Sequence, residues 1–378
     1  MATSSGLPKK SGSLVRIGTL TLKGGIDWYT GAVCLPGHKL LLLGGGINTV
    51  KLYDRDTGDL IRESERLKSK PWDVCVYNER KSQVAVALGN GTVEILYVQS
   101  IGQTAVIRPT RTMQTKLKVC HGVYALSNGD QFVVSGRSSD EMHCWSLVSS
   151  TSVKVEMIHK ICPYRSLGSS YVAVNIEESN VYISCASGPK SHDTGVYGYD
   201  LYSGRYKATY RHVDLPWPKG ICLDHRGYIY VCNQFPPSIH QLTENLQQVQ
   251  IFKQGIPQLP WEICLDEIYD FYITSWKSND ISRFRMLWKQ QEENTTLKSA
   301  SSNGKEVQLN VDDSKTRTST HSGLVHGRKP PLNTEGVLHA KSAEVPEDPN
   351  RGILCFIQSF YMQTDTHNCH QTTLIIFT

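Results

Sequence analysis

The sequence has no run of 18 or more apolar residues, and its start, MATSSGLPKKSGS, has basic residues with no apolar segment behind them. We therefore expect neither a membrane span nor a secretory signal. The 11 cysteines are an odd number and include no CxxC pair, and most lie in strand-like apolar runs such as WDVCVY and GICLDH. This pattern favours buried free thiols in a reducing compartment over a disulfide framework, so we expect a cytoplasmic protein.

The usual motifs of catalysis are also missing. No G-x-S-x-G, P-loop, H-E-x-x-H or G-x-G-x-x-G in a βαβ context occurs in the chain. The glycines at 44–46 lie between two strand-like runs with no helix after them, which is a poor cradle for phosphate. We therefore expect a binding module with no cofactor, and no enzyme.

The composition allows a sizeable core. Hydrophobic residues make up 39 % of the chain, with 18 Tyr, 7 Trp and 8 Phe, and most of them precede residue 288. The net charge of +5 is mild for 378 residues. It is compatible with an acidic or nucleic-acid partner but does not require one.

Self-comparison shows an internal repeat. The segment KGICLDHRGYIYVCN aligns without a gap on HGVYALSNGDQFVVSG, so that Gly122 falls on Gly220 and Gly129 on Gly227. Each copy is a short apolar strand, a turn and a second strand of β-forming residues. Six copies begin near Ala32, Asp73, Gly122, Val172, Gly220 and Glu262, with spacings of 41, 49, 50, 48 and 42 residues.

Each copy continues with two further strand-like runs, which gives four strands per unit. Repeats of 40 to 50 residues built from strands are typical of propeller blades. The sixth unit lacks its outer strand, and the N-terminal run at 14–23 has no blade of its own. We predict an all-β, six-bladed β-propeller that this strand closes, which removes the open sheet edges. The rival, a seven-bladed WD-repeat propeller, would need a seventh unit and repeated WD and Gly-His pairs, and the sequence has neither.

The predicted domains are a disordered head at 1–13, the propeller at 14–287 and a disordered tail at 288–378. The tail is rich in Ser, Thr, Asn and charge, with few aromatic residues until its last stretch. That last stretch is either an unstructured end or a short docking segment.

The segments KPWDVCVYNERKSQVAVAL, CHGVYALSNGDQFVVSG and KGICLDHRGYIYVCNQFPPSIHQLTENLQQVQIF resemble the C-terminal, NHL-repeat-like six-bladed propellers of invertebrate tripartite-motif proteins. The resemblance covers residues 14–287. It implies a propeller that selects the target of a ubiquitin ligase, and some propellers of the family bind RNA while others bind proteins. The chain shows no zinc-module spacing and no heptad run, so a role in ubiquitination would be that of a substrate-binding part.

Cations and aromatic residues gather in the loops that lead from one predicted blade to the next. Such loops lie on one face of a propeller, the top face, where function tends to be found. Phosphate contacts and base stacking would suit single-stranded RNA, and an acidic protein surface would suit the same residues. Polar loops and tryptophans that pack between blades are the plainer explanation. The candidate binding residues are Arg66, Lys68, Lys70, Trp72, Arg111, Lys116, Lys118, Lys160, Tyr164, Arg165, Arg211, Trp217 and Lys219.

Three other patterns are weaker. Cys34, Cys75, Cys222 and Cys264 recur at one repeat position, which indicates packing more than a metal cage. Two histidines and a cysteine at 367–370 are too close together to reach one ion in good geometry. A gluconolactonase-like calcium hydrolase would need converging ligands, for which Asn175, Asp224, Asn233 and Glu262 are the candidates.

We therefore expect a recognition or scaffold propeller that binds a protein partner, with RNA as the alternative. DNA and membrane partners are not expected. Without a coiled coil the chain is expected to be monomeric.

Overall fold

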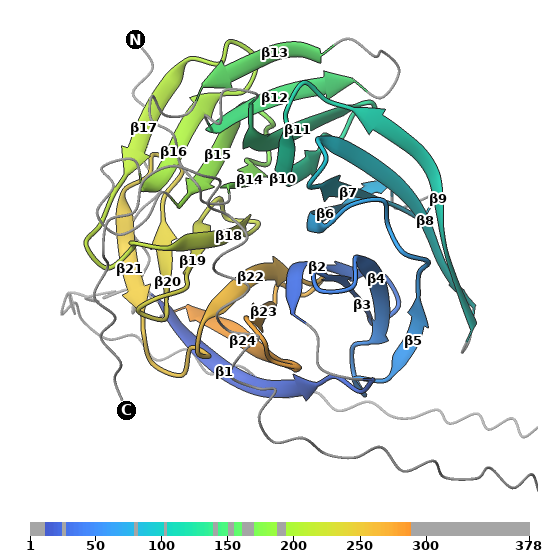
Figure 1. Cartoon of the computed structure of the whole chain (residues 1–378). Coiled ribbons are helices and arrows are strands. Elements are labelled where there is room, and N and C mark those ends of the chain that lie inside the picture. Colours follow the sequence, from blue (N-terminus) through green and yellow to red (C-terminus); the bar gives the residue numbers. More distant parts are fainter. Residues whose placement is uncertain are drawn as a thin grey trace, which may run out of the picture. The chain divides into compact units, whose positions relative to one another are not determined.

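Six four-stranded antiparallel sheets follow one another around a central channel (Figure 1). The computed structural model describes residues 12–24, 28–78, 82–101, 104–138, 143–149, 155–160, 170–186 and 194–288. Each sheet is one blade. The first strand of each predicted repeat lies innermost, and in the sixth blade the N-terminal strand of the chain lies outermost. The prediction of an all-β, six-bladed propeller is confirmed.

The strands of the first three blades are β2 (Tyr29–Leu35), β3 (Lys39–Gly44), β4 (Thr49–Asp54) and β5 (Leu60–Glu63); β6 (Pro71–Asn78), β7 (Gln83–Leu88), β8 (Thr92–Ile101) and β9 (Thr104–Gln114); and β10 (Val119–Ala125), β11 (Gln131–Arg137), β12 (His143–Ser149) and β13 (Val155–Lys160). Those of the last three are β14 (Ser170–Val174), β15 (Asn180–Cys185), β16 (Gly195–Asp200) and β17 (Tyr206–Tyr210); β18 (Pro218–Leu223), β19 (Ile229–Asn233), β20 (Ser238–Leu242) and β21 (Gln248–Phe252); and β22 (Pro260–Leu265), β23 (Phe271–Ser275), β24 (Asp280–Trp288) and β1 (Gly12–Thr21).

The N-terminal strand closes the ring as predicted. β1 pairs with β24 from Gly12 opposite Trp288 to Thr21 opposite Asp280, and the Thr21 hydroxyl donates to the Asp280 carboxylate at 2.7 Å. The strand occupies 12–21, where the sequence predicted 14–23. The rest of the predicted head, at 1–11, and the tail beyond Trp288 lie outside the described residues.

The core lies between neighbouring blades. The second strands, such as β3 and β7, are buried along nearly their whole length, because each blade packs against a neighbour on both faces. The outer strand β9, by contrast, is mostly exposed. This explains why the second strands read as continuous apolar runs.

The observed strand pairing shows that two of the six predicted repeat starts are displaced by one residue. Gly45 N–H donates to Trp28 C=O, as Gly89 N–H does to Lys70 C=O in the next blade, so the residue equivalent to Asp73 is Gly31. In the fourth blade the residue equivalent to Asp73 is Tyr171. The predicted starts at Ala32 and Val172 were therefore wrong by one residue, and a slip of one residue along a strand exchanges its two faces.

The same slip affects the cysteines. Cys34 pairs one position further along its strand than Cys75, Cys222 and Cys264 do, so the predicted four-fold equivalence is wrong for Cys34. The Cys34 and Cys264 sulfur atoms lie 3.8 Å apart, at hydrogen-bond distance, and form no disulfide. All eight cysteines among the described residues are free.

Candidate binding face and central channel

The loops between blades lie at the same end of the propeller as the loops between the second and third strands. Leu67 N–H donates to Asn48 C=O at 2.7 Å, and Gly89 N–H donates to Lys70 C=O at 2.8 Å, which joins the two kinds of loop. This end is the top face.

Lys70 lies between two tryptophans on the top face. Its ammonium nitrogen is 4.0 Å from the ring centroid of Trp28 and 3.9 Å from that of Trp72. Trp72 in turn meets the ring of His121 edge-on at 4.9 Å between centroids. Burial lowers the pKa of Lys70 to about 8. The cation is thus held by aromatic faces in place of water.

A second lysine completes the cluster. Lys219 is buried, with its ammonium nitrogen 4.2 Å from the centroid of Trp261, which packs against Trp276 at 4.4 Å. Trp276 meets Trp28 edge-on at 4.0 Å. Burial, followed by the charge of Lys70, lowers the pKa of Lys219 to about 8. We name this set the tryptophan–lysine cluster: Trp28, Lys70, Trp72, His121, Lys219, Trp261 and Trp276.

Three of the cluster's tryptophans were not among the predicted residues. Trp261 could have been found, because Pro-Trp-Glu at 260–262 repeats Pro-Trp-Asp at 71–73. Trp28 and Trp276 occupy positions that hold other residue types in the neighbouring blades. No repeat signal marks them.

The predicted site residues differ in exposure. Arg66, Lys68, Lys116, Lys118 and Arg211 are exposed. Arg111 is exposed but lies within the outer strand β9, where it pairs with Ile95, and not in a loop. Lys70, Trp72 and Trp217 are half-buried, and Lys219 is buried. Trp72 and Lys219 lie within the inner strands β6 and β18, and not in the loops where the sequence placed them. Tyr164, Arg165 and the side chain of Lys160 lie outside the described residues.

The loop that carries Trp217 is fixed by buried hydrogen bonds. Trp217 N–H donates to the Asn233 side chain at 2.9 Å, and the Asn233 amide donates to Asp214 C=O at 3.0 Å. His240 lies 2.9 Å from the Tyr210 hydroxyl, and burial lowers the pKa of His240 to about 4, so its ring is neutral at pH 7. This part of the top face is therefore a rigid surface.

The candidate calcium ligands do not come together. Asn175 accepts the N–H groups of Ser179 and Asn180 and so holds the turn after β14. Asp224 holds the equivalent turn of the fifth blade by accepting two backbone N–H groups and the Tyr230 hydroxyl, while Asn233 fixes the loop at the other end of the blade. Within the described ranges, no group of three His, Cys, Asp or Glu could hold a metal. The pattern at 367–370 lies outside these ranges.

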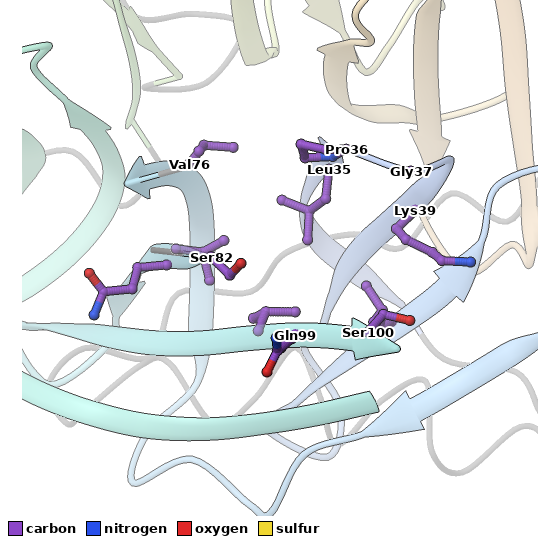
Figure 2. Close-up of a pocket in the computed structure, with 12 residues that line it drawn as sticks. Leu35, Pro36, Gly37, Lys39, Val76, Ser82, Gln99 and Ser100 are labelled. Carbon is purple, nitrogen blue, oxygen red and sulfur yellow. The ribbon is translucent and has the colours of Figure 1, made fainter. Parts of the chain in front are cut away.

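Glu262, the remaining candidate, lines the central channel together with Asp73. The channel holds a cavity of about 350 Å³ between the first strands of the blades. A second cavity of about 310 Å³ lies between the first two blades (Figure 2). Of the described residues that line this second cavity, the charged one is Lys39, which pairs with Asp54 at 3.1 Å.

No family model matches the chain, and no curated protein does. Among the residues that the structure describes, no helix is long and apolar enough to cross a membrane.

Proposed function

We propose that this propeller is a non-catalytic recognition module that binds an acidic surface of a protein partner on its top face. The observation that carries the proposal is the tryptophan–lysine cluster, together with the exposed cations Arg66, Lys68, Lys116 and Lys118 in loops of the same face. Tryptophan is enriched at the centres of protein interfaces, and exposed cations around such a centre favour association with an acidic partner. Propellers commonly act as scaffolds for such contacts.

RNA is the second candidate because cations and aromatic rings lie on the same face. The geometry favours protein. The ammonium group of Lys70 occupies faces of Trp28 and Trp72, and that of Lys219 occupies a face of Trp261, so these ring faces are already in use and not open to bases. Of the predicted aromatic residues that the structure describes, this leaves Trp217 for base stacking, and Trp217 is half-buried.

A place among the NHL-like propellers of tripartite-motif proteins is part of the proposal. The six blades support it, as does the turn in which Asp224 accepts the N–H groups of Arg226 and Tyr228 while Gly227 adopts a φ of 79°. Under this proposal the chain is the substrate-binding part of a ubiquitin-ligase system. The eight free thiols support a reducing compartment such as the cytoplasm.

The test is a charge reversal that leaves the cluster intact. Lys68, Lys116 and Lys118 become Glu together, while Lys70 is kept because it is packed between rings. We expect a partner that the wild-type protein retains from nuclease-treated extract to be lost by this variant, because three attractive contacts become repulsive. Retention is measured by quantitative mass spectrometry of the captured proteins.

The matched control reverses three exposed cations outside the top face, Arg62, Arg108 and Arg205, and should retain the partner. Anisotropy of a labelled single-stranded RNA, titrated at two salt concentrations, runs beside it. RNA binding that falls steeply with salt and vanishes only in the top-face variant would replace the protein proposal by RNA binding. If the top-face and control variants behave alike with both probes, the top face is not the binding site.

A further inference from the structure

One residue from each inner strand forms a layer across the channel. Gly31, Gly122 and Gly220 alternate with three residues that carry side chains, Asp73, Tyr171 and Glu262. A β-carbon on each glycine would lie only 2.8–3.0 Å from the α-carbon of the neighbouring blade's residue, namely Asp73, Tyr171 or Glu262. The glycines therefore let the blades approach closely, and alternate blades supply the side chains of this layer.

The two carboxyl groups of the layer are buried, with Asp73 8 % and Glu262 4 % exposed. Asp73 accepts the N–H groups of Val74 at 2.8 Å and, from the next blade, of Val123 at 2.9 Å. One oxygen of Glu262 accepts the N–H of Ile263 at 3.0 Å, whereas the other, Oε2, has no hydrogen-bond partner among the described residues.

No described residue forms an ion pair with either carboxyl group. Burial raises the pKa of both Asp73 and Glu262, and the charge of Asp73 raises that of Glu262 further. Two buried carboxyl groups that interact, one of them with a buried oxygen left over, are an unusual arrangement for a structural core.

Asp73 and Glu262 are both among the residues that line the cavity of about 350 Å³. The other walls are mainly apolar, with Val33, Val123 and Ala125 among them. The lining continues along the inner strands to Ile176, which is 60 % exposed in the turn after β14. The cavity thus has the acidic residues Asp73 and Glu262 at one end and apolar walls that lead to the face opposite the top face.

We propose that this cavity binds a small primary amine with an apolar body, its ammonium group at Glu262 and Asp73. An ammonium donates up to three hydrogen bonds, and the Glu262 Oε2 atom is an acceptor without a partner. The apolar walls suit an alkyl or aryl body of the size that such cavities hold. The amine reaches the layer from the face opposite the top face, because Lys70 and Lys219 would repel it on the other side.

Other cations fit the same atoms less well. Calcium takes six to eight oxygen ligands, and magnesium needs a nearly octahedral set. Three of the four carboxylate oxygens already accept backbone N–H groups, which leaves too few for either ion. The primary ammonium is the cation whose needs match this layer.

The experiment compares n-hexylamine with n-hexanol, its neutral counterpart, by isothermal titration calorimetry at pH 8. We expect hexylamine to bind the wild-type protein at least about tenfold more tightly than hexanol does. Glu262→Gln keeps the shape of the side chain but removes the charge, so it should abolish this preference. The matched control, Glu65→Gln, alters an exposed carboxylate outside the channel and should leave the preference unchanged.

A second variant guards against misfolding of the first. Ala125→Leu enlarges a half-buried side chain in the cavity wall without touching either carboxyl group, and it should weaken hexylamine binding. Equal affinity for hexylamine and hexanol in the wild-type protein would overturn the proposal, as would unchanged hexylamine binding in both variants. Binding of calcium or zinc chloride with no binding of hexylamine would assign the layer to a metal ion instead. None of these outcomes depends on the top-face partner.

Discussion

Two adjacent layers of the channel remove opposite charges from water in different ways. Trp72 and Trp261 each directly precede one of the acidic residues, Asp73 and Glu262. In the tryptophan–lysine cluster the cations rest on ring faces, whereas the carboxyl groups of the next layer depend on backbone N–H groups and leave one oxygen without a partner. Both cations of the cluster have ring partners within it, whereas one oxygen of the carboxyl layer has no hydrogen-bond partner among the described residues. The first suits a rigid surface and the second suits a ligand.

The largest effect is expected when a side chain is added to the carboxyl layer at one of its glycines. At Gly220 a β-carbon would lie 2.8 Å from the Glu262 α-carbon and 2.2 Å from its Oε1. We expect Gly220→Val to lower the free energy of unfolding by about 3 kcal/mol, because the two blades must move apart. Urea denaturation measures this change.

The control for Gly220→Val is Gly18→Val. At Gly18 a β-carbon would meet no atom within 4 Å, and the residue lies in the outermost strand β1. Its free energy of unfolding should change by about 0.5 kcal/mol or less. Equal losses in both variants would show that the close approach of the blades at Gly220 does not limit the packing.

Blade number and ring closure could be predicted from the sequence, because both follow from the spacing of apolar runs. Every blade repeats the turn between its first two strands, and the unpaired run at the N-terminus has one place to pair. The carboxyl layer could not be predicted. Gly31 and Tyr171 lack the Pro-Trp-acid signature of Asp73 and Glu262, so the aligned repeats slipped by one residue there and hid the alternation.

The exposure of the candidate cations could not be predicted from the sequence either. Lys68 and Lys219 are both lysines near the start of an inner strand, yet the first is exposed and the second is buried. The difference arises from Trp261, which belongs to the next blade and covers the Lys219 side chain. Such contacts between blades leave no local pattern in the chain.

Glu262→Gln removes one buried charge from the carboxyl layer and so tests whether that charge destabilises the fold. The raised pKa of Glu262 means that the folded protein holds this proton more tightly than the unfolded chain, whose glutamate pKa is about 4.3. Its contribution to stability therefore falls as pH rises above about 4 and stays unfavourable once the folded carboxyl group has ionised. The variant should be more stable than the wild-type protein by about 1–2 kcal/mol at pH 8, with no such advantage at pH 4.

Urea midpoints between pH 4 and pH 8 measure the gap between Glu262→Gln and the wild-type protein. Glu65→Gln, on an exposed loop outside the channel, is the matched control for the change of side chain. A gap that widens toward pH 4 would mean that the buried carboxylate stabilises the fold, contrary to the comparison.

Lys219→Met tests the tryptophan–lysine cluster, where stability is expected to change with pH in the opposite direction. The folded pKa of about 8 lies below the value of about 10.4 for an unfolded lysine, so the unfolded chain binds more protons in this range. The wild-type protein should therefore gain stability as pH rises from 8 to 10.5, and the variant, with no charge to lose, should not share this gain. We expect Lys219→Met to be more stable by about 1 kcal/mol at pH 7, since Trp261 offsets part of the burial cost through its contact with the ammonium group.

The difference between the thermal unfolding curves of the variant and the wild-type protein is measured at each pH. It cancels the titration of the buried cysteines and tyrosines, which both proteins share. If the stability advantage of the variant grows toward pH 10.5, the expected direction of the pH dependence is wrong. If the variant is less stable than the wild-type protein at pH 7, the contact with the Trp261 ring more than compensates for the lost hydration of the Lys219 ammonium group.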